Sequence, residues 1–459
     1  MRRGNVIILT AIAIGAMTLA SCSSSSNGSA SSSSGSSNTV SGNSANAALG
    51  TGVTAHTVKV GVALVNFSCI EQFVNTIRTN QDQVYQDYIN WINSHGGIDG
   101  RKIIPDYQSY CPIGNTQALS LCTQFTEDAH VFAVIGDFVD FSGDSQTCIA
   151  RDHDTVLLTF DLSQAIINQS PPGLIILPGQ TPERSDAVLI SLMNAQHTLK
   201  GKKVAILSEI DSQSVVQNSV EPGLKKLGIP IGSTAILNVG SSADTSEAQT
   251  QLASFIERWK SENVTALFVS GTEVASQQFI EMVRQQMPTV TLISDDNSTD
   301  ILGYAQQEER AGRRPNPYEG IILVGGPTPQ EYDASSNWKY CANIYQDETG
   351  KVAPNAVTVT PGPNGKTLDT YGTINDACQL LTEMQEIAQR AGPNLNNQTW
   401  VNAVDHYGPI RDVGAGVYAS LHTGKYDDND TFRLEKFSSS IGTDGGLQPI
   451  TPLEDVPAT

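Results

Sequence analysis

The sequence predicts an α/β protein built as two doubly wound lobes, and three observations predict it. Apolar, β-branched runs typical of buried strands recur along the chain, beginning with residues 57–65. Stretches with a helical period separate these runs, so successive strands must pair in parallel through right-handed crossovers. The alternation occurs in two sets, which meet near residue 180, and this indicates two sheets rather than one.

The first helix and its end illustrate the pattern. Residues 81–95 follow a helical period, and the stretch NSHGGIDGRKI (93–103) comes next. Gly96 or Gly97 is expected to end the helix in the left-handed conformation, which glycine adopts without steric cost. Ile98 then packs back on the helix, and the Asp-Gly pair that follows turns the chain into a strand. These glycines mark the end of the helix and the turn into the strand, and we expect no catalytic or binding role for them.

The remaining elements continue the alternation in chain order. In the first set we expect a helix at 115–130, a strand at 131–138, a short helix near 145–151, and strands at 155–161 and 173–179. The second set begins with a helix for which Thr181 is the predicted N-cap and Pro182 the first helical residue. Its strands are expected at 202–211, 229–237, 264–271, 289–296 and 319–326, with helices between them. Two late helices, 330–347 and 368–391, precede irregular short strands at 405–439.

The N-terminus reads as an export signal. Two arginines precede an apolar run at 6–19 that is too short for a typical membrane-spanning helix. Leu19-Ala20-Ser21-Cys22 resembles a bacterial lipobox, so 1–22 is predicted to be a lipoprotein signal peptide with Cys22 acylated; an ordinary secretory signal is the alternative. Residues 23–55 are rich in Ser, Gly, Asn and Ala and predict a flexible tether that spans roughly 30 Å.

Composition narrows the function classes. The chain has 459 residues and a net charge of −20 from 27 basic and 47 acidic side chains, which argues against binding to nucleic-acid phosphates. Hydrophobic residues make up 39% of the chain, enough to build a core in each lobe. Signatures of nucleophilic hydrolases, zinc proteases and phosphate-binding loops are missing from the sequence, so we expect no enzyme activity and no cofactor.

Six cysteines remain after Cys22, an even number in an exported chain, and this favours disulfides. Six cysteines allow 15 pairings, of which we expect Cys69–Cys111, Cys122–Cys148 and Cys341–Cys378. The last pair joins the two late helices and would stabilise the fold by about 4 kcal/mol in the loop-entropy description. His153 has acidic neighbours, yet we expect a surface histidine rather than a metal ligand, and no metal site. The acidic run YDDNDTF (426–432) lacks the glycine of a calcium loop and is expected to be a solvated turn.

Five runs between about residues 57 and 440 share a pattern: VKVGVAL, YINWINSHGGIDGRKIIPDYQSYC, FTEDAHVFAVIGDF, LKGKKVAILSEID and DTYGTINDACQLLTEMQEIAQRAG. Together they resemble the type I periplasmic solute-binding proteins of the leucine/isoleucine/valine-binding kind, the receptors of ABC importers. The resemblance implies the type I periplasmic-binding-protein fold, in which the chain crosses between lobes three times and forms a multi-crossing hinge. Mapped onto this sequence, lobe one is 57–180 and 328–400, lobe two is 181–327 and 401–450, and 451–459 is a tail.

Candidate ligand-binding residues follow the predicted strands, because ligands of open parallel sheets lie beyond the carboxyl ends of the strands. The candidates in lobe one are Asn66, Phe67, Asp137, Phe138, Phe141, Ser142, Phe160 and Asp161. Those in lobe two are Glu209, Asp211, Thr272 and Asp295, with Gly271 and Asp296 beside them. The acidic excess favours a ligand with a positive group, and the aromatic rings could cover an apolar part. The alternative is that these acids are only solvated turn residues or helix caps.

The function predicted from the sequence is a lipid-anchored extracytoplasmic receptor. We expect a monomer that captures a small polar molecule, such as an amino acid, an amide or a related solute, between its lobes. It would deliver the solute to an ABC permease while Cys22 holds it on the lipid bilayer. Two alternatives remain: a sensory or adhesion lipoprotein that is not coupled to transport, and a secreted hydrolase.

Overall fold

The computed structural model of the chain describes residues 48–456, except residues 73, 75, 139–141, 161, 240–244, 296–298, 357, 359 and 412–417. The predicted signal peptide, Cys22 and most of the predicted tether lie outside the described residues. So do two of the candidate ligand-binding residues, Phe141 and Asp161.

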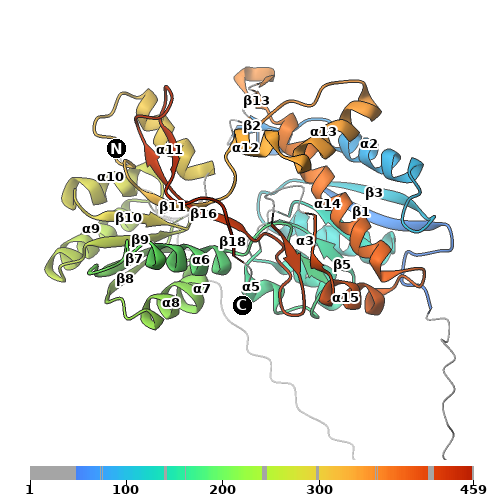
Figure 1. Cartoon of the computed structure of the whole chain (residues 1–459), viewed down its shortest axis with the longest axis horizontal. Coiled ribbons are helices and arrows are strands. Elements are labelled where there is room, and N and C mark those ends of the chain that lie inside the picture. The colour runs from blue at the N-terminus through green and yellow to red at the C-terminus, as the bar shows by residue number, and fades with distance from the viewer. Residues whose placement is uncertain are drawn as a thin grey trace, which may run out of the picture. The chain divides into compact units, whose positions relative to one another are not determined.

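The first lobe is built on a parallel sheet with the strand order β3-β1-β4-β5-β6 (Figure 1). Its strands are β1 (Thr57–Val65), β3 (Lys102–Tyr110), β4 (Ala133–Gly136), β5 (Val156–Leu158) and β6 (Ile175–Ile176). Pro105 lies inside β3, which is possible because β3 is an edge strand and one side of it needs no hydrogen-bond donor. The connections change direction between β1 and β4, and this topological switch places a crevice at the carboxyl ends of these two strands.

Helices cover both faces of this sheet. On one side α2 (Gln81–Ser94) packs with α13 (Ser336–Thr349) and α14 (Thr370–Ala391). The π-helical turn η1 (Gln124–Asp128) packs on the other side, where Gly61 leaves room for the Phe125 ring. The other helical elements of the lobe are α1 (Phe67–Ile70), α3 (Thr116–Thr123), α4 (Asp144–Thr147), η2 (Cys148–Asp152), α5 (Gln164–Ile167), α12 (Pro329–Ala334), η4 (Pro363–Gly365) and α15 (Asn397–Asp405). Short strands complete it: β2 (Thr76–Ile77), β12 (Thr360–Pro361), β13 (Thr367–Leu368), β14 (Gly408–Pro409) and β15 (Ser420–Leu421).

The second lobe has its own sheet, in the order β17-β16-β11-β10-β9-β7-β8. The parallel strands are β7 (Val204–Glu209), β8 (Ile231–Leu237), β9 (Ala266–Ser270), β10 (Thr291–Ser294) and β11 (Ile322–Gly325). Antiparallel strands β16 (Thr431–Ser438), β17 (Gly446–Pro449) and β18 (Glu454–Asp455) extend it. Two separate sheets confirm the predicted class, two doubly wound α/β lobes.

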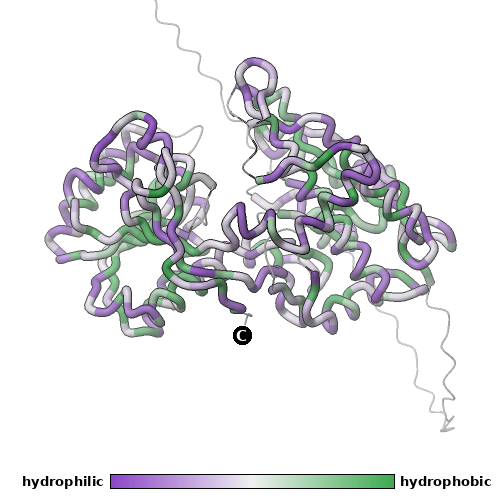
Figure 2. The backbone as a smooth tube through the Cα atoms, turned by 45° about the horizontal axis from the view of Figure 1, so that its top comes forward, coloured by the Kyte–Doolittle hydropathy of each residue, from purple (hydrophilic) through white to green (hydrophobic). Residues whose placement is uncertain are grey.

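Strand alternation divides the core of the second lobe between two helical layers. Ile206 packs on the face covered by α6 (Pro182–Ala195), α7 (Gln213–Val215), η3 (Val216–Val220) and α8 (Glu221–Lys226). Leu207 packs on the face covered by α9 (Thr245–Ser261), α10 (Gln277–Gln286) and α11 (Thr299–Arg310). Figure 2 shows the hydrophobic residues concentrated in the strands, with hydrophilic residues along the outer helices and loops.

Local signals in the sequence form as predicted. Helix α2 ends at Ser94, Gly96 and Gly97 have φ of +103° and +63°, and Ile98 is buried in the core. A Cβ at Gly97 would lie 2.0 Å from the carbonyl oxygen of Arg101, so only glycine fits this turn. Thr181 caps α6 by accepting a hydrogen bond from the backbone N–H of Arg184. All three expected disulfides are present: Cys69–Cys111, Cys122–Cys148 and Cys341–Cys378.

Three segments connect the lobes, and two of them run side by side. The first follows β6, the second follows β11, and the third precedes β16. Leu177 of the first segment donates to the carbonyl of Tyr426 in the third at 2.8 Å, and Asp428 donates back to Leu177 at 3.1 Å. The Asn429 N–H donates to the carbonyl of Gly179 at 2.8 Å. The predicted multi-crossing hinge is therefore built as a two-stranded connection plus a single one.

The lobe boundaries differ from the predicted ones at three places. Residues 401–426 were predicted in lobe two, but Val404, Leu421 and Tyr426 pack in the core of lobe one. This occurs because α15 continues the α14 packing before the chain crosses. The predicted tether ended at residue 55, whereas Val53 is already buried in lobe one. The predicted tail from 451 includes β18, which pairs with β16.

Candidate functional site

The first lobe carries one group of candidate residues at the carboxyl end of β1. Asn66 caps α1, and its side-chain oxygen accepts from the backbone of Ser68 at 3.1 Å. Asn66 and Phe67 line a cavity of about 590 Å³. The Cys69–Cys111 disulfide joins this loop to the end of β3, so it holds one wall of the cavity. The other residues that line the cavity are Leu64, Val65, Ser68, Glu71, Ile77, Arg78, Thr79, Asn80, Gln81, Asp82, Tyr107, Ser109 and Pro363.

The remaining candidates of lobe one are placed differently. Phe138 is only 2% exposed and stacks on Tyr110, so it belongs to the core rather than to a ligand surface. Asp137 is half-buried after β4, and its backbone carbonyl accepts from the Tyr110 hydroxyl at 3.0 Å. Phe160 is half-buried against the core, and Ser142 is exposed. Asn66, Phe67, Asp137, Ser142 and Phe160 therefore remain as candidates among the described residues of this lobe.

Arg78 is the cationic side chain of the cavity, and it is already paired. Its guanidinium donates to Asp369 at 3.0 Å and to Asp376 at 2.5 Å. Burial lowers the pKa of Arg78, but the carboxylates of Asp376 and Asp369 outweigh burial and raise it. The pairing ties the β2 region to the start of α14, which makes Arg78 a structural cation.

The second lobe brings its candidates together at the ends of three adjacent strands. Glu209 ends β7, Thr272 follows β9, and Asp295 follows β10. Asp295 accepts from the Ser270 hydroxyl at 2.6 Å and from the Gly271 N–H at 3.4 Å. Asp211 is exposed and lies outside this group.

Glu209 is held over Gly271 from the other side. Its carboxylate accepts from the Glu273 N–H at 2.9 Å, and a Cβ at Gly271 would lie 2.2 Å from its carboxyl carbon. Gly271 has φ of +104°, so both conformation and space require glycine here. Burial raises the pKa of Glu209 to about 7, with Asp295 adding to the shift against the hydrogen bond from Glu273.

Sequence reasoning missed a third acid at this edge. Asp186 lies in the second turn of α6, is fully buried, and neither of its carboxylate oxygens has a hydrogen-bond partner among the residues that the structure describes. Burial raises the pKa of Asp186 well above its ordinary value, and Asp295 and Glu183 add to the effect. The sequence does contain a signal for its burial, because Asp186 is an acid on the same helix face as the apolar residues Leu189 and Ile190. Residues 186, 209 and 295 are called the strand-end acids below.

The run 426–432 was predicted to be a solvated turn, and that prediction is wrong. Its acids are buried in the third crossing segment, where they meet two cations. Arg184 pairs with Asp427 at 3.2 Å and with Asp430, and Lys425 lies 3.4 Å from Asp430. Asp428 accepts from the Gly179 N–H at 2.6 Å. This hinge cluster, defined as Arg184, Lys425, Asp427, Asp428 and Asp430, borders a second cavity of about 270 Å³.

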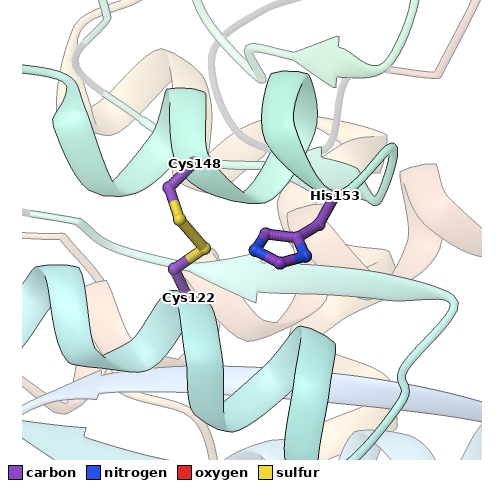
Figure 3. A group of neighbouring side chains, drawn as sticks. All are labelled: Cys122, Cys148 and His153. Atoms are coloured by element: carbon purple, nitrogen blue, oxygen red, sulfur yellow. A yellow bond between two sulfur atoms is a disulfide. The ribbon is translucent and has the colours of Figure 1, made fainter. Parts of the chain in front are cut away.

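A third group combines a disulfide with a histidine (Figure 3). One ligand-type atom from each of Cys122, Cys148 and His153 lies within 4.8 Å of the others. The two sulfurs are bonded to each other at 2.06 Å, so neither is a thiolate that could ligate a metal. His153 is half-buried and lies 3.5 Å from Glu127, which makes it a partner for a surface acid.

Comparison with solved structures identifies the fold. An ABC transporter substrate-binding protein from Desulfitobacterium hafniense is similar at 16% identity with a TM-score of 0.58, and the match covers 86% of this chain and 100% of that one. A fatty acid ABC transporter substrate-binding protein from Thermomonospora curvata is similar at 16% identity with a TM-score of 0.57, and the match covers 89% of this chain and 94% of that one. The branched-chain amino acid transporter substrate-binding protein LivJ from Streptococcus pneumoniae, in complex with isoleucine, is similar at 13% identity with a TM-score of 0.53. That match covers 86% of this chain and 100% of that one. No protein-family profile and no curated protein sequence matches the chain.

These similarities define a class of fold. Two doubly wound lobes joined by three crossings, with polar residues at the strand ends, form the type I periplasmic-binding-protein fold. The similar structures named above are substrate-binding proteins of ABC transporters. Within the described part of the chain, no helix combines the length and the apolar character needed to span a bilayer.

Proposed function

We propose that the chain is an extracytoplasmic solute-binding lipoprotein that captures a small polar molecule and delivers it unaltered to an ABC permease. The observation that carries the proposal is the pair of sheets joined by three crossing segments, each sheet ending in polar residues at its carboxyl edge. A hinge of this kind lets a ligand contact both lobes in one conformation only, so binding shifts the population toward that conformation.

The proposed ligand contacts come from both lobes. Asn66, Phe67, Asp137 and Phe160 provide a polar and aromatic wall in lobe one. Glu209, Thr272 and Asp295 provide an acidic wall in lobe two. The amino-acid, amide or related solute of the proposal fits these polar groups. The similar structures support a solute-binding role, and the solute of this chain is a matter for experiment.

Ligand-dependent thermal unfolding tests the proposal. The chain carrying Cys22→Ser is screened against amino acids, amides, amines and sugars, and a bound solute is expected to raise the Tm by mass action. At a free solute concentration of 100 times Kd, the free energy of unfolding rises by about 2.7 kcal/mol. Chromatography of the recovered solute checks that it is unaltered. Consumption of the solute would support the hydrolase alternative, and a screen without any Tm shift would contradict the proposal.

The lipid anchor is proposed from residues 1–22 and is tested separately. The unaltered chain, expressed in a bacterium with lipoprotein processing, is expected to partition into the detergent phase after extraction. Cys22→Ser is expected to move it to the aqueous phase, because one or two acyl chains supply the membrane affinity. Equal partitioning of both proteins would contradict anchoring through Cys22.

A further inference from the structure

Two π-helical turns of the first lobe lie beside the Cys122–Cys148 disulfide. Cys122 lies two residues before η1, and Glu127 lies within this turn. Cys148 is the first residue of η2, and His153 follows its last residue. Turns of this kind are rare and occur frequently at functional sites, so two of them beside one disulfide favour a role for this group beyond cross-linking.

The π-helical turns explain why these side chains share a face. Each cysteine is followed five positions later by a residue type that binds metals: Glu127 after Cys122, and His153 after Cys148. In an α-helix of 3.6 residues per turn, residues five apart point about 140° away from each other. The i→i+5 hydrogen bonds of a π-helical turn bring residues five apart onto one face instead. Each turn therefore directs the later residue toward its cysteine.

The four side chains lie close together as a result. Figure 3 shows the His153 ring pointing toward the disulfide, and its ligand-type nitrogen and the two sulfurs all lie within 4.8 Å of one another. On its other side, the Nε2 atom of His153 lies 3.5 Å from the Oε1 atom of Glu127. Two sulfurs, one imidazole and one carboxylate are the ligand types that zinc prefers in proteins.

The distances suit a tetrahedral zinc ion once the disulfide is open. With Zn–S bonds of about 2.3 Å and Zn–N or Zn–O bonds of about 2.0–2.2 Å, the ligand atoms of such an ion lie roughly 3.3–3.8 Å apart. The distance between His153 and Glu127 is already in this range. Glu127 is 58% exposed, so its side chain can turn toward the ion at little cost. While the disulfide is intact, neither sulfur binds a metal.

The thiol form precedes the disulfide in the exported chain proposed above. Disulfides form in an oxidising compartment, so Cys122 and Cys148 are thiols until the chain has left the cytoplasm. Binding of Zn²⁺ displaces one proton from each thiol, and the ion cancels the two thiolate charges. This cancellation matters because Cys122 is fully buried, and a buried anion without a cation is costly.

We propose that, in its reduced form, the chain binds one Zn²⁺ ion through Cys122, Cys148 and His153. Glu127 is the fourth ligand. The ion joins α3 to η2 until the disulfide replaces it. When a disulfide reagent oxidises the site, the Cys122–Cys148 bond forms, two electrons pass to the reagent, the reagent leaves as two thiols after taking up two protons, and Zn²⁺ is released. The ion and the disulfide are thus alternative links between the same two helical segments.

Metal titration of the Cys22→Ser chain tests the inference. The chain is reduced under native conditions with a phosphine, and mass mapping of alkylated thiols checks that the 122–148 bond is open. We expect the reduced chain to bind one Co²⁺ ion with a thiolate-to-cobalt charge-transfer band, and Zn²⁺ to displace it. Zn²⁺ should bind the reduced chain at least about 100-fold more tightly than the oxidised chain. Oxidised glutathione should then release the ion, which a chromogenic chelator detects.

Variants locate the ion. His153→Ala should weaken Zn²⁺ binding by about 100-fold, and Glu127→Gln by about tenfold. His56→Ala, at an exposed histidine before β1, is the matched control and should leave the affinity unchanged. Cys148→His cannot form this disulfide but keeps a ligand-type side chain at the position, so it should bind Zn²⁺ without a reductant while the other two disulfides stay closed. Circular dichroism checks the fold of each protein.

Three results would overturn the inference. The first is equal Zn²⁺ affinity before and after reduction. The second is an affinity that His153→Ala leaves unaltered, because the ion would then be held by other thiols, such as those of Cys69 and Cys111. The third is a folded Cys148→His protein that binds no Zn²⁺, which covers the case in which opening all three disulfides unfolds the reduced chain.

Discussion

The acids of the hinge cluster and the strand-end acids differ in what neutralises them. In the hinge cluster, Asp427 and Asp430 share Arg184 and Lys425 as ion-pair partners, and their remaining oxygens accept hydrogen bonds. Among the strand-end acids, Asp186 accepts no hydrogen bond from any of the described residues, and Glu209 accepts from the Glu273 N–H and, at 3.5 Å, from the Ser212 hydroxyl. The comparison shows that burial alone does not mark a ligand site: the buried acids of the hinge cluster are neutralised by cations and hold the fold together, whereas Asp186 is buried with no hydrogen-bond partner among the described residues.

The largest expected effect comes from removing a cation from the hinge cluster. Lys425→Met removes a buried cation and leaves the carboxylates of the hinge cluster with Arg184 alone, so the free energy of unfolding should fall by about 3–5 kcal/mol. Urea denaturation measures it. Lys225→Met, at a side chain that is 65% exposed in a surface pair with Glu221, should change stability by less than about 0.5 kcal/mol. Equal effects at the two lysines would show that the buried pairing contributes no special stability.

The next effect tests how Glu209 is held. Gly271→Ala places a methyl group 2.2 Å from the Glu209 carboxyl carbon at a φ of +104°, and should destabilise the chain by about 2 kcal/mol. Adding Glu209→Ala should relieve the clash but leave the conformational strain, so the two changes should not be additive. Thermal unfolding of the four proteins of this cycle measures the coupling. Gly303→Ala on α11, where a methyl group meets nothing within 4 Å, should be neutral or slightly stabilising. Simple additivity would contradict the packing of Glu209 on Gly271.

The smallest expected effect is a pH dependence. The pKa of Glu209 is raised from 4.5 to about 7, so between these values the folded chain binds more protons than the unfolded chain. Its contribution to stability is therefore present below about pH 4.5 and is lost as the pH rises through 7. Because the side chain is partly exposed, the loss should be about 1–2 kcal/mol. Glu209→Gln should flatten the Tm profile from pH 5 to pH 8, while Glu247→Gln should not. A profile that Glu209→Gln leaves unaltered would contradict the raised pKa.

Features that depend on short-range chemistry were predictable from the sequence. The left-handed glycines after α2 and the cap at Thr181 follow from residue types and their position between strands and helices. The three disulfides join more distant residues, and they were predicted from the even number of cysteines and the predicted elements that carry them. Polar ends of β7, β9 and β10 were predictable too, because a parallel sheet brings its carboxyl ends together. The candidates Phe141 and Asp161 stay predictions, since they lie outside the described residues.

Features that depend on contacts between residues far apart in the sequence were not predictable. The burial of YDDNDTF depends on Arg184, which lies 243 residues from Asp427 in the sequence, and no local sequence pattern predicts that contact. The same holds for residues 401–426, whose apolar side chains would suit either lobe. Phe138 was misplaced because an aromatic residue after a strand can point either to solvent or to a core neighbour such as Tyr110.

The side-by-side first and third crossings have a consequence for how the chain reaches its final state. Neither lobe is a continuous piece: the earlier one is completed by α13, α14 and α15, and the later one by β16 and β18. As the chain is synthesised from its N-terminus, the second sheet lacks β16 and β17 until nearly the last thirty residues have been added. A fragment cut at the junction near residue 180 would accordingly lack the strands and helices that close each half, and only a rearranged chain order would yield a single lobe.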